Sequence, residues 1–579
     1  MKGLTYNGLK KYKGLICAFV LAAVAAAVFT MLTALSVTDF LQILFPSEGT
    51  SGAEASPSLG LQAANPVLRM LEGVYAFLIA QGTQRALFLY ALLLLAVYGT
   101  KNVMSYLQAV FFARFKNNLM RDIRNGLHRS VLMQRIDGWS QQRQGQWLSR
   151  MTADMTEYEA NMLDGFQALV QAAISMAIYI LMLFYLDWEL TLAVLVVMGV
   201  GTLLLSTSRR LKRQSRLLQG LNADLVSLTQ ETLDSLKEIK AATAIDYVNA
   251  RQAEQNALFT KRRIAIYRRI NAASPLSDFI GNTIVVGILM VGAVRVLGPN
   301  ATMPPALFVS YIMIYVLLLT PIKDLSNAIA QLKKGRGVEE VLMESLPAAT
   351  ELAALSPAAL PSPSLSPVTS IELRDVSFGY GERPVLQHLN WEVAMQHSTA
   401  IVGESGSGKT TLGRLVTGLV EEQQGTVLIN GLPTTASQRR GTIAYVPQEA
   451  MLFNDTVAGN IRMGRDWLTD EDIAVAIRVA QLETTVSRLP NGILTRLGDG
   501  GGRLSGGERQ RINIARALAG KPDVIVMDEA TAALDAATEQ ALNEALHSHL
   551  SNATLLIIAH RASTIARCNE VMNVSAFAS

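Results

Sequence analysis

A stretch near the N-terminus, residues 14–37, restricts the fold more than any other feature, because it contains no charged residue. It is long enough for a helix to cross the roughly 30 Å hydrocarbon core of a bilayer, and too long for the apolar part of a signal peptide. The sequence therefore predicts an α-helical transmembrane domain with six spans. The other five runs, which carry few charges, are residues 86–112, 162–185, 190–205, 279–294 and 306–319.

The distribution of positive charge predicts the orientation of these spans. Lys2, Lys10, Lys11 and Lys13 precede the first run, and the segments between the second and third runs and between the fourth and fifth are rich in Arg and Lys. The intervening loops, such as "LDW" and "GPNATMPP", are poor in cations. Because cytoplasmic loops carry the excess of Lys and Arg, we expect the N-terminus and both basic segments in the cytoplasm.

Each basic segment is far too long for a simple turn and has no Gly/Pro-rich break. In the second segment, Leu225, Leu228, Thr232, Leu236 and Ile239 recur at steps of three and four, which is typical of an amphipathic helix. We expect both segments to be helices that continue out of the bilayer as a stalk. We interpret their arginines as a solvated face beside lipid headgroups rather than as substrate contacts.

Ionisable residues within or at the ends of the spans are candidates for substrate contact, because a charge in lipid is costly. Lys101, Asp278 and Lys323 are such residues. The alternative is that their side chains extend to the interface. We keep Asp278 and Lys323 as substrate candidates.

The composition agrees with a membrane protein and excludes other classes. Half of the 579 residues are hydrophobic and 17% are charged, which is unusual for a soluble protein. The formal net charge of +4 is too small to indicate nucleic-acid binding. The two cysteines, Cys17 and Cys568, suggest neither a disulfide framework nor a metal site, and we expect two buried or partly buried thiols.

The last part of the chain has the pattern of a soluble α/β domain. A Pro/Ser/Ala-rich segment precedes it and predicts a linker with little regular structure. We therefore expect a transmembrane domain at 1–345, a linker at 346–370 and a nucleotide-binding domain at 371–579.

A phosphate-binding loop stands near the start of this soluble domain. "TAIVGESGSGKTTLGRLVTGLV" gives a short apolar strand, the pattern G-x-x-x-x-G-K-T and an apolar-periodic helix. Backbone N–H groups of the loop can wrap a polyphosphate, Lys409 can reach the β- and γ-phosphates, and the Thr410 hydroxyl can ligate Mg²⁺.

A second buried strand, in "PDVIVMDEATAALD", ends in two carboxylates. Asp528 is placed to hold Mg²⁺, and Glu529 to polarise the attacking water. A further strand, "TLLIIAH", ends at His560, which is positioned to contact a γ-phosphate or the water. Lys409, Glu529 and His560 are therefore the predicted catalytic residues.

A P-loop with an acidic strand end does not distinguish kinases, GTPases, helicases and transport ATPases, but "LSGGERQR" does. It resembles the signature sequence of the ABC superfamily. In that family, the signature loop of one protomer closes over the ATP held by the P-loop of the other. Here the implied second anion site consists of Leu504, Ser505, Gly506, Gly507 and Glu508.

The resemblance implies roles for further residues. Tyr380 matches the aromatic that stacks on adenine, and Gln448 the glutamine that contacts Mg²⁺. Asp535 matches the loop that crosses the dimer interface, although Ala532 stands where the family usually has Ser. The implied metal ligands are Thr410, Gln448 and Asp528. The implied ATP-binding residues are Tyr380, Gly403, Glu404, Ser405, Gly406, Ser407, Gly408, Lys409, Thr410, Thr411 and Gln448.

The chain is most similar to bacterial homodimeric lipid and multidrug half-exporters, and the match spans almost its whole length. Residues 136–157 and 231–250 look like the two coupling regions of six-span exporters, and "PIKDLSNAIAQLKKG" resembles the end of the sixth span in lipid A flippases, which would give Lys323 a lipid-phosphate role. Members of the family continue further past the histidine strand, so we expect a nucleotide domain that is short at its C-terminus.

The resemblance implies an ATP-driven exporter of a lipid or amphipathic substrate in the bacterial inner membrane, with ATP and Mg²⁺ as cofactors and a second copy of the chain as partner. It implies a multi-pass protein with its N-terminus and nucleotide domain in the cytoplasm, and no nucleic acid. Two alternatives stay open. One is an exporter of peptides or drugs that forms half of a heterodimer, and the other is a membrane-bound regulatory ATPase that moves no substrate.

Overall fold

The computed structural model describes residues 3–44, 83–134, 136, 141–205, 228–297, 305–346, 367–381, 383–549 and 552–577. The chain divides into two compact units: Met1–His128 with Ser149–Leu346, and Arg129–Leu148 with Pro347–Ser579. Residues 347–366 of the predicted linker lie outside the described residues.

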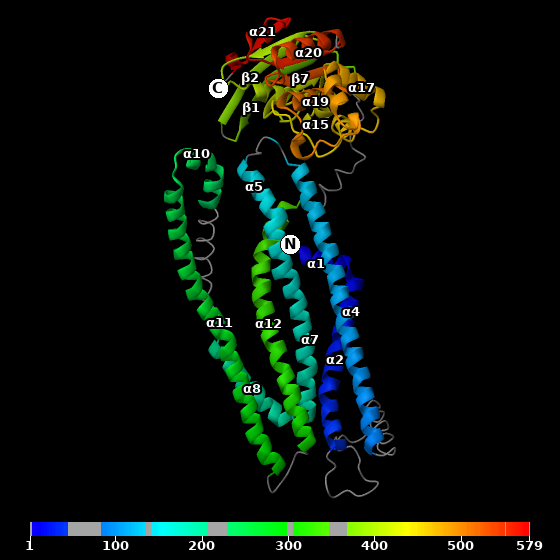
Figure 1. Ribbon diagram of the computed structural model, residues 1–579, viewed down its shortest axis with the longest axis vertical. Coiled ribbons are helices and arrows are strands. Elements are labelled where there is room, and N and C mark those ends of the chain that lie inside the picture. The colour runs from blue at the N-terminus through cyan, green and yellow to red at the C-terminus, as the bar shows by residue number, and fades with distance from the viewer. Residues whose placement is uncertain are drawn as a thin grey trace. The chain divides into compact units, whose positions relative to one another are not determined.

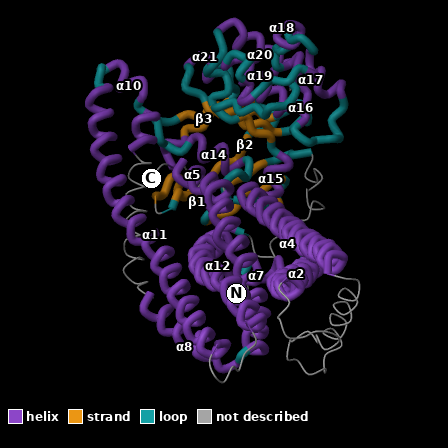
Figure 2. The backbone as a smooth tube through the Cα atoms, turned by 60° about the horizontal axis from the view of Figure 1, so that its bottom comes forward, coloured by secondary structure: helices purple, strands orange, loops and turns teal. Residues whose placement is uncertain are grey.

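The described chain before Leu346 is helical apart from turns (Figures 1 and 2). Its helices are α1 (Leu4–Lys11), α2 (Lys13–Leu44), α4 (Thr83–Leu132), α5 (Gln141–Ser149), α6 (Met155–Tyr158), α7 (Asp164–Leu186), α8 (Trp188–Leu205), α10 (Leu236–Ala241), α11 (Ile245–Leu297) and α12 (Pro305–Ser345), with π-helical turns η2 (Arg150–Asp154) and η3 (Glu159–Leu163) between α5 and α7.

Five helical stretches of the described residues are long and apolar enough to cross a membrane: Lys13–Ser36, Leu87–Leu132, Gly145–Leu186, Phe279–Val296 and Leu307–Ser345. Each of them contains or overlaps one of the predicted spans. The remaining predicted span, residues 190–205, lies in the 18-residue helix α8, in which the side chains of residues 197–205 lie outside the described part. The helical transmembrane fold predicted from the sequence is confirmed.

Two of the helices are much longer than a bilayer requires. α4 has 50 residues and α11 has 53. At 1.5 Å per residue a helix of fifty residues is about 75 Å long, more than twice the roughly 30 Å hydrocarbon core. The expected continuation of the spans into long helices is therefore present.

The second stalk segment differs from its prediction. The helix that contains Leu228 is interrupted at Ser235, α10 ends at Ala241, and α11 begins at Ile245 after a turn. Thr243 in this turn has φ 51°, a left-handed conformation that is rare for a β-branched residue. Of the expected apolar stripe, Leu228 is buried but Leu236 is 44% exposed, and Leu225 lies outside the described residues.

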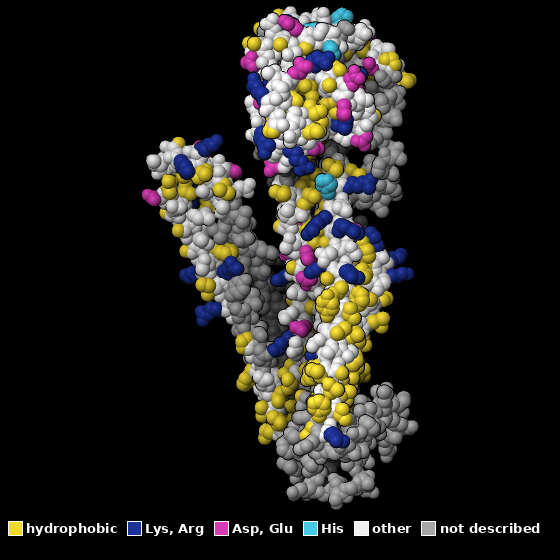
Figure 3. All heavy atoms as spheres, turned by 45° about the vertical axis from the view of Figure 1, so that its right-hand side comes forward, with side chains coloured by type: hydrophobic (Ala, Val, Ile, Leu, Met, Phe, Trp, Pro, Cys, Tyr) yellow, Lys and Arg dark blue, Asp and Glu magenta, His cyan; other side chains and the backbone are white. Residues whose placement is uncertain are grey.

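The core of the first unit, called the membrane unit below, is made of side chains from α2, α7, α8, α11 and α12. Tyr311 and Tyr315 of α12 are fully buried there beside Leu183 of α7. Many outward-facing side chains are also apolar, and Figure 3 shows hydrophobic side chains gathered along the long helices of this unit. Exposed apolar side chains on α4, α7, α8 and α11 suit a lipid environment; they include Phe88, Leu95, Leu181, Leu192, Phe279 and Met290.

The N-terminal helix α1 is fixed to this unit by polar contacts. The backbone N–H and the hydroxyl of Thr5 both donate to Glu339 Oε1 of α12, at 2.8 and 2.9 Å. Lys11 forms an ion pair with Asp122 of α4. A carboxylate at a helix N-terminus is electrostatically favourable, so the buried Glu339 holds α1 in place. Cys17 of α2 is exposed, contrary to the prediction, whereas Cys568 is half-buried.

The second unit contains two sheets. An antiparallel sheet has the order β2-β1-β4-β5, and a parallel sheet has the order β6-β7-β8-β3-β9. The strands are β1 (Ile371–Tyr380), β2 (Arg383–Val393), β3 (Ser398–Val402), β4 (Gln424–Ile429), β5 (Leu432–Pro433), β6 (Ala444–Val446), β7 (Val524–Asp528), β8 (Thr554–Ile558) and β9 (Glu570–Asn573).

Helices pack around the parallel sheet (Figure 2). One apolar core lies between helices and this sheet, and the second combines strands of both sheets with the helix after the P-loop. β7 is buried along its whole length, as expected for a central parallel strand. These helices are α14 (Lys409–Val416), α15 (Ala436–Thr442), α16 (Val457–Arg462), α17 (Asp470–Val479), α18 (Glu483–Arg488), α19 (Gly506–Leu518), α20 (Ala536–His549) and α21 (Ala562–Ile565).

The strand order brings the predicted catalytic residues together. β8 pairs with both β3 and β7, with Asp528 opposite Ile558, and β6 pairs with β7. Because all these strands are parallel, the loops after β3, β6, β7 and β8 leave the same edge of the sheet. Those loops carry the P-loop, Gln448, Glu529 and His560.

Candidate nucleotide site

The loop between β3 and α14 has the conformation that its glycines predict. Gly406 and Gly408 have φ of 84° and 94°, and a Cβ on Gly408 would lie 2.9 Å from Val385 Cγ1, so a side chain is excluded there. Gly408 is the N-cap of α14 and provides no side-chain hydrogen bond to the first turn. The N-terminus of α14 is thus left to bind an anion through backbone N–H groups.

Lys409 and Ser407 are buried within this loop. Lys409 Nζ donates to the carbonyl oxygens of Gly403 and Glu404, at 2.9 and 2.7 Å, so the ammonium lies over the loop that it belongs to. Ser407 Oγ is one of few buried side-chain atoms in the described part that lack a hydrogen-bond partner. An unpaired buried hydroxyl is costly unless a ligand satisfies it, which fits a polyphosphate in the loop.

Asp528 at the end of β7 is a buried carboxylate with two hydroxyl partners. It is 2% exposed, and it accepts hydrogen bonds from Thr410 Oγ1 at 3.2 Å and from Tyr445 Oη at 3.0 Å. Burial raises its pKa, and the two hydroxyl hydrogen bonds counteract this only in part. Burial, and next the neighbouring Asp528, raise the pKa of Tyr445 to about 12, so Tyr445 is a permanent donor at neutral pH.

This environment fits a divalent cation. A buried carboxylate beside a threonine hydroxyl offers the hard oxygen ligands that Mg²⁺ prefers. Among the described residues, no three His, Cys, Asp or Glu side chains form a metal-binding group. A cation there would therefore need further oxygens from water and phosphate, as is usual for Mg²⁺ bound with a nucleotide.

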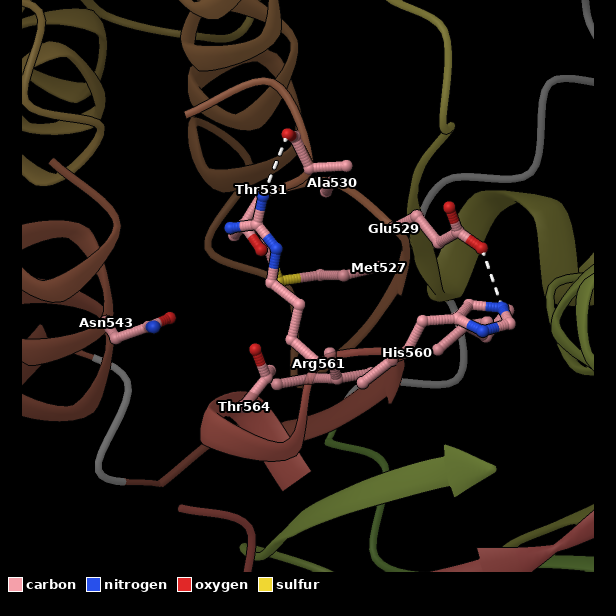
Figure 4. Close-up of a pocket in the computed structure, with 12 residues that line it drawn as sticks. Met527, Glu529, Ala530, Thr531, Asn543, His560, Arg561 and Thr564 are labelled. Atoms are coloured by element: carbon pink, nitrogen blue, oxygen red, sulfur yellow. Dashed lines mark hydrogen bonds and ion pairs between the residues drawn. The ribbon is translucent and has the colours of Figure 1, made fainter. Parts of the chain in front are cut away.

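Glu529 follows Asp528 and lies between two other predicted site residues. Its Oε1 is 2.9 Å from His560 Nε2, and its Oε2 accepts a hydrogen bond from Gln448 Nε2 at 2.8 Å. The Glu529 backbone has φ 46°, which is unfavourable for a non-glycine residue. The structure thus brings Gln448, Glu529 and His560 together, and Figure 4 shows the His560 ring facing the Glu529 carboxylate.

Tyr380 is half-buried at the end of β1, and its hydroxyl accepts a hydrogen bond from Arg414 Nη1 at 3.3 Å. Thr411 is buried, whereas Glu404 and Ser405 are exposed. These residues lie on or near the P-loop and α14, as their motif predicts.

The signature residues begin α19. Ser505 is its N-cap and forms a capping box: Ser505 Oγ accepts from the Glu508 N–H, and Glu508 Oε2 accepts from the Ser505 N–H. Ser505 and Gly506 are exposed and Leu504 is buried. Asp535 caps α20 in a similar way by accepting from the Thr538 N–H and hydroxyl.

Of the two substrate candidates, the structure describes the side chain of only one. Lys323 is half-buried on α12, and the side chain of Asp278, on α11, lies outside the described part.

Sequence reasoning missed four residues at or beside the site. Arg414 and Tyr445 contact the predicted residues Tyr380 and Asp528, and Glu539 and Arg561 lie behind Glu529 and His560. Tyr445 lies in β6, three residues before Gln448, but nothing in the sequence shows that its hydroxyl points at Asp528.

Two family models match the chain. The model described as ABC transporter transmembrane region matches residues 15–322, more than half of the chain, and the model described as ABC transporter matches residues 386–532.

Similar proteins are known in bacteria. The chain is 32% identical to the "ATP-dependent lipid A-core flippase" of Desulfotalea psychrophila, over 83% of this chain and 84% of that protein. It is 29% identical to the protein of the same name from Syntrophus aciditrophicus, over 83% and 80%. The solved structure of a bacterial Atm1-family ABC exporter with ATP bound has the same fold, with a TM-score of 0.71 and 21% identity, over 98% of this chain and 94% of that chain.

Proposed function

The chain belongs to the ABC transporter family, and on that premise we propose that it is one half of a dimeric exporter that flips a lipid out of the cytoplasmic leaflet. Its ABC ATPase domain binds ATP and couples ATP hydrolysis to transport across the membrane. The substrate class is supported by the name of the flippases it resembles, and by the apolar surfaces of its spans. Another hydrophobic or amphipathic molecule would suit the same surfaces.

The residues that hold ATP are those of the P-loop, with Tyr380 beside the base. Backbone N–H groups of Gly406, Gly408 and Lys409 and the open N-terminus of α14 surround the phosphates, and the Ser407 hydroxyl gains the partner that it lacks. The full set is Tyr380, Gly403, Glu404, Ser405, Gly406, Ser407, Gly408, Lys409, Thr410, Thr411 and Gln448.

Thr410, Gln448 and Asp528 would hold Mg²⁺. When bound, this ion neutralises charge on the phosphate oxygens. The role of Thr410 and Asp528 is supported by their direct hydrogen bond, which brings both oxygens to one point. Tyr445 holds the second oxygen of Asp528 and so keeps the carboxylate turned toward Thr410.

One observation carries the proposal of hydrolysis: the Glu529 carboxylate is held from both sides, by Gln448 and by His560, one residue beyond Asp528. Each carboxylate oxygen has two acceptor sites, so Glu529 can accept a proton from an attacking water while it keeps these contacts. His560 orients Glu529, and Lys409 stabilises charge on the phosphate that is transferred to water.

A second copy of the chain completes each ATP site. Ser505, Gly506 and the start of α19 are exposed, so they are accessible to a nucleotide that a partner brings. Asp535 lies in an exposed loop and would cross the same interface. Moving a two-state transporter from 1:99 to 99:1 needs about 5.5 kcal/mol of differential binding. Two ATP molecules that contact both protomers only in the closed state can supply it.

The protein is an integral membrane protein. Its location in the bacterial inner membrane, with the N-terminus and the nucleotide domain in the cytoplasm, is part of the proposal. The lysines before the first span and the two arginine-rich segments support this orientation.

The test compares the wild type with Glu529→Gln in proteoliposomes. We expect the variant to bind ATP normally but to hydrolyse it and to flip a fluorescent lipid at least about 100-fold more slowly, because the proton acceptor is lost. Glu449→Gln is the matched control, since Glu449 is an exposed carboxylate in the loop that carries Gln448.

Normal hydrolysis by Glu529→Gln would refute the role of Glu529. ATPase activity that no lipid stimulates, together with an absence of flipping in the wild type, would favour a regulatory ATPase over an exporter.

A further inference from the structure

A pocket lies behind the Glu529–His560 pair, between the chain that follows β7 and the chain that follows β8 (Figure 4). Arg561 crosses it from the end of β8 toward Ala530 and Thr531. Arg561 forms an ion pair with Glu539 of α20, whose Oε2 lies 2.6 Å from Arg561 Nη1. Glu539 is only 8% exposed.

The other oxygen of Glu539 has two partners. Oε1 accepts hydrogen bonds from Thr531 Oγ1 at 3.0 Å and from Thr564 Oγ1 at 3.2 Å. Arg561 in turn donates through Nη2 to the carbonyl oxygen of Ala532, at 3.2 Å. One carboxylate and one guanidinium thus connect three segments of the chain.

Two of these segments carry the catalytic pair. Thr531 stands two residues after Glu529, and Arg561 directly follows His560. Any shift of the Thr531–Ala532 segment relative to Arg561 would therefore change the distance between Glu529 and His560. The contacts of Glu539 oppose such a shift.

The backbone at Glu529 needs this support. Its φ of 46° is a conformation that persists in a non-glycine residue only when the surrounding structure imposes it. One restraint is the hydrogen bond from the Glu529 N–H to the Ile558 carbonyl, at 3.2 Å. Two others are the contact of Glu539 with Thr531 and the contact of Arg561 with Ala532, two and three residues further along the chain.

We propose that Glu539, paired with Arg561, is a positioning residue for ATP hydrolysis: it fixes the chain on both sides of the Glu529–His560 pair. The inference rests on the proposed function, since it requires that this pair acts in hydrolysis. Glu539 itself touches neither residue of the pair in the described contacts, so it acts through Thr531, Arg561 and Thr564.

The test uses the full-length protein and measures kcat, KM for ATP, nucleotide affinity and thermal unfolding. The variants are Glu539→Gln, Arg561→Gln and the double variant. The matched control is Glu422→Gln, which breaks a second Arg–Glu pair of the same unit, with the buried Arg439. Glu422 contacts no residue of the candidate site in the described part.

We expect both single variants to lower kcat between about 10-fold and 100-fold, because a small displacement of catalytic groups is enough for such a loss. KM and nucleotide affinity should stay within about twofold, since the P-loop is untouched. The double variant should be no slower than the slower single variant, because both changes break one pair. Glu422→Gln should lower the unfolding temperature and keep kcat.

A folded Glu539→Gln with a kcat within about twofold of the wild type would overturn the proposal, and so would multiplicative effects of the two changes. If Glu539→Gln does not fold, Arg561→Gln is the deciding variant. Arg561→Gln removes both the ion pair with Glu539 and the N–H that reaches Ala532, at a half-exposed site, so a wild-type kcat in that variant would also refute the inference. A wild type without ATPase activity would refute the proposed function instead.

Discussion

Two glycine-containing loops of the second unit each lead into a helix, and the N-termini of these two helices differ. α14 begins after Gly408, in a left-handed conformation and without a side-chain cap. α19 begins after Ser505, whose side chain and Glu508 satisfy each other's backbone N–H groups. The first helix start is open within its own chain, and the second is already capped.

The difference indicates how each loop meets an anion. The open start of α14, with Lys409 folded over the loop, is prepared for the phosphates of a nucleotide in the same chain. The capping box of α19 stabilises an exposed loop while no partner is present. A phosphate of a nucleotide that is bound to a second subunit would then meet a loop in which Glu508 already accepts a hydrogen bond from the Ser505 N–H. The phosphate would either add to this contact or compete with it.

The largest effect is expected at the first helix start. Lys409→Ala removes the only side-chain cation of the P-loop and its two hydrogen bonds to the loop carbonyls. ATPase activity should fall at least about 100-fold, as it does when a charge-stabilising group is lost, and a fluorescent nucleotide should bind more weakly. Lys521→Ala is the control, because Lys521 is an exposed lysine of the same unit that pairs with Asp472. Wild-type hydrolysis by Lys409→Ala would show that the open start of α14 is not the site.

At the second helix start, Ser505→Ala should separate stability from activity. Loss of the cap costs about 0.5–2 kcal/mol of unfolding free energy. If the hydroxyl also contacts the partner's nucleotide, kcat should fall about 10-fold or more as well. Thr469→Ala is the matched control, because Thr469 caps α17 in a capping box with Asp472 and has no predicted contact with ATP. It should lose the same stability and keep its kcat. Equal kcat values for the two variants would contradict a role for Ser505 beyond capping.

The sequence predicted the first helix start well, because a P-loop is a contiguous motif that imposes its own conformation. Asp528, Glu529 and His560 could also be predicted, since parallel strands place their ends at one edge of a sheet. The capping box at Ser505 was missed, although S-x-x-E is a local signal for it. Glu539 could not be found, because its role depends on contacts with Thr531 and with the chain after His560.

The membrane unit was predictable in its spans but not in its details. Hydropathy marks a helix that crosses a bilayer, and five of the six spans match apolar helices in the described residues. The turn at Thr243 escaped prediction because it contains neither Gly nor Pro. The contact between Thr5 and Glu339 joins residues 334 positions apart, which no periodic pattern reveals.

A smaller effect is expected from pH at the cap of α19. The hydrogen bond from the Ser505 N–H is the largest factor that lowers the pKa of Glu508 below its ordinary value of 4.5. A lowered pKa means that the charged carboxylate stabilises the folded state above about pH 4.5, and that this stability is lost as the pH falls through the folded pKa. Glu508→Gln should therefore be less stable than the wild type by about 1 kcal/mol at pH 7.5, and the difference should shrink at pH 4. Thermal unfolding at both pH values tests this. A difference that does not change with pH would mean that the charge of Glu508 does not contribute to the cap.

The smallest change in the free energy of unfolding is expected at Gly506, the first residue of α19. Gly408 must be glycine for reasons inside its own chain, but a Cβ on Gly506 would meet nothing within 4 Å in the described part. Because alanine has the higher helix propensity, Gly506→Ala should raise the free energy of unfolding by roughly 0.5 kcal/mol, as thermal unfolding can measure. If a nucleotide of the partner packs against this backbone, the same variant should hydrolyse ATP more slowly although it is more stable. Gly506→Ala with unchanged ATPase activity would mean that no partner approaches here, and the second helix start would then be only a capped helix.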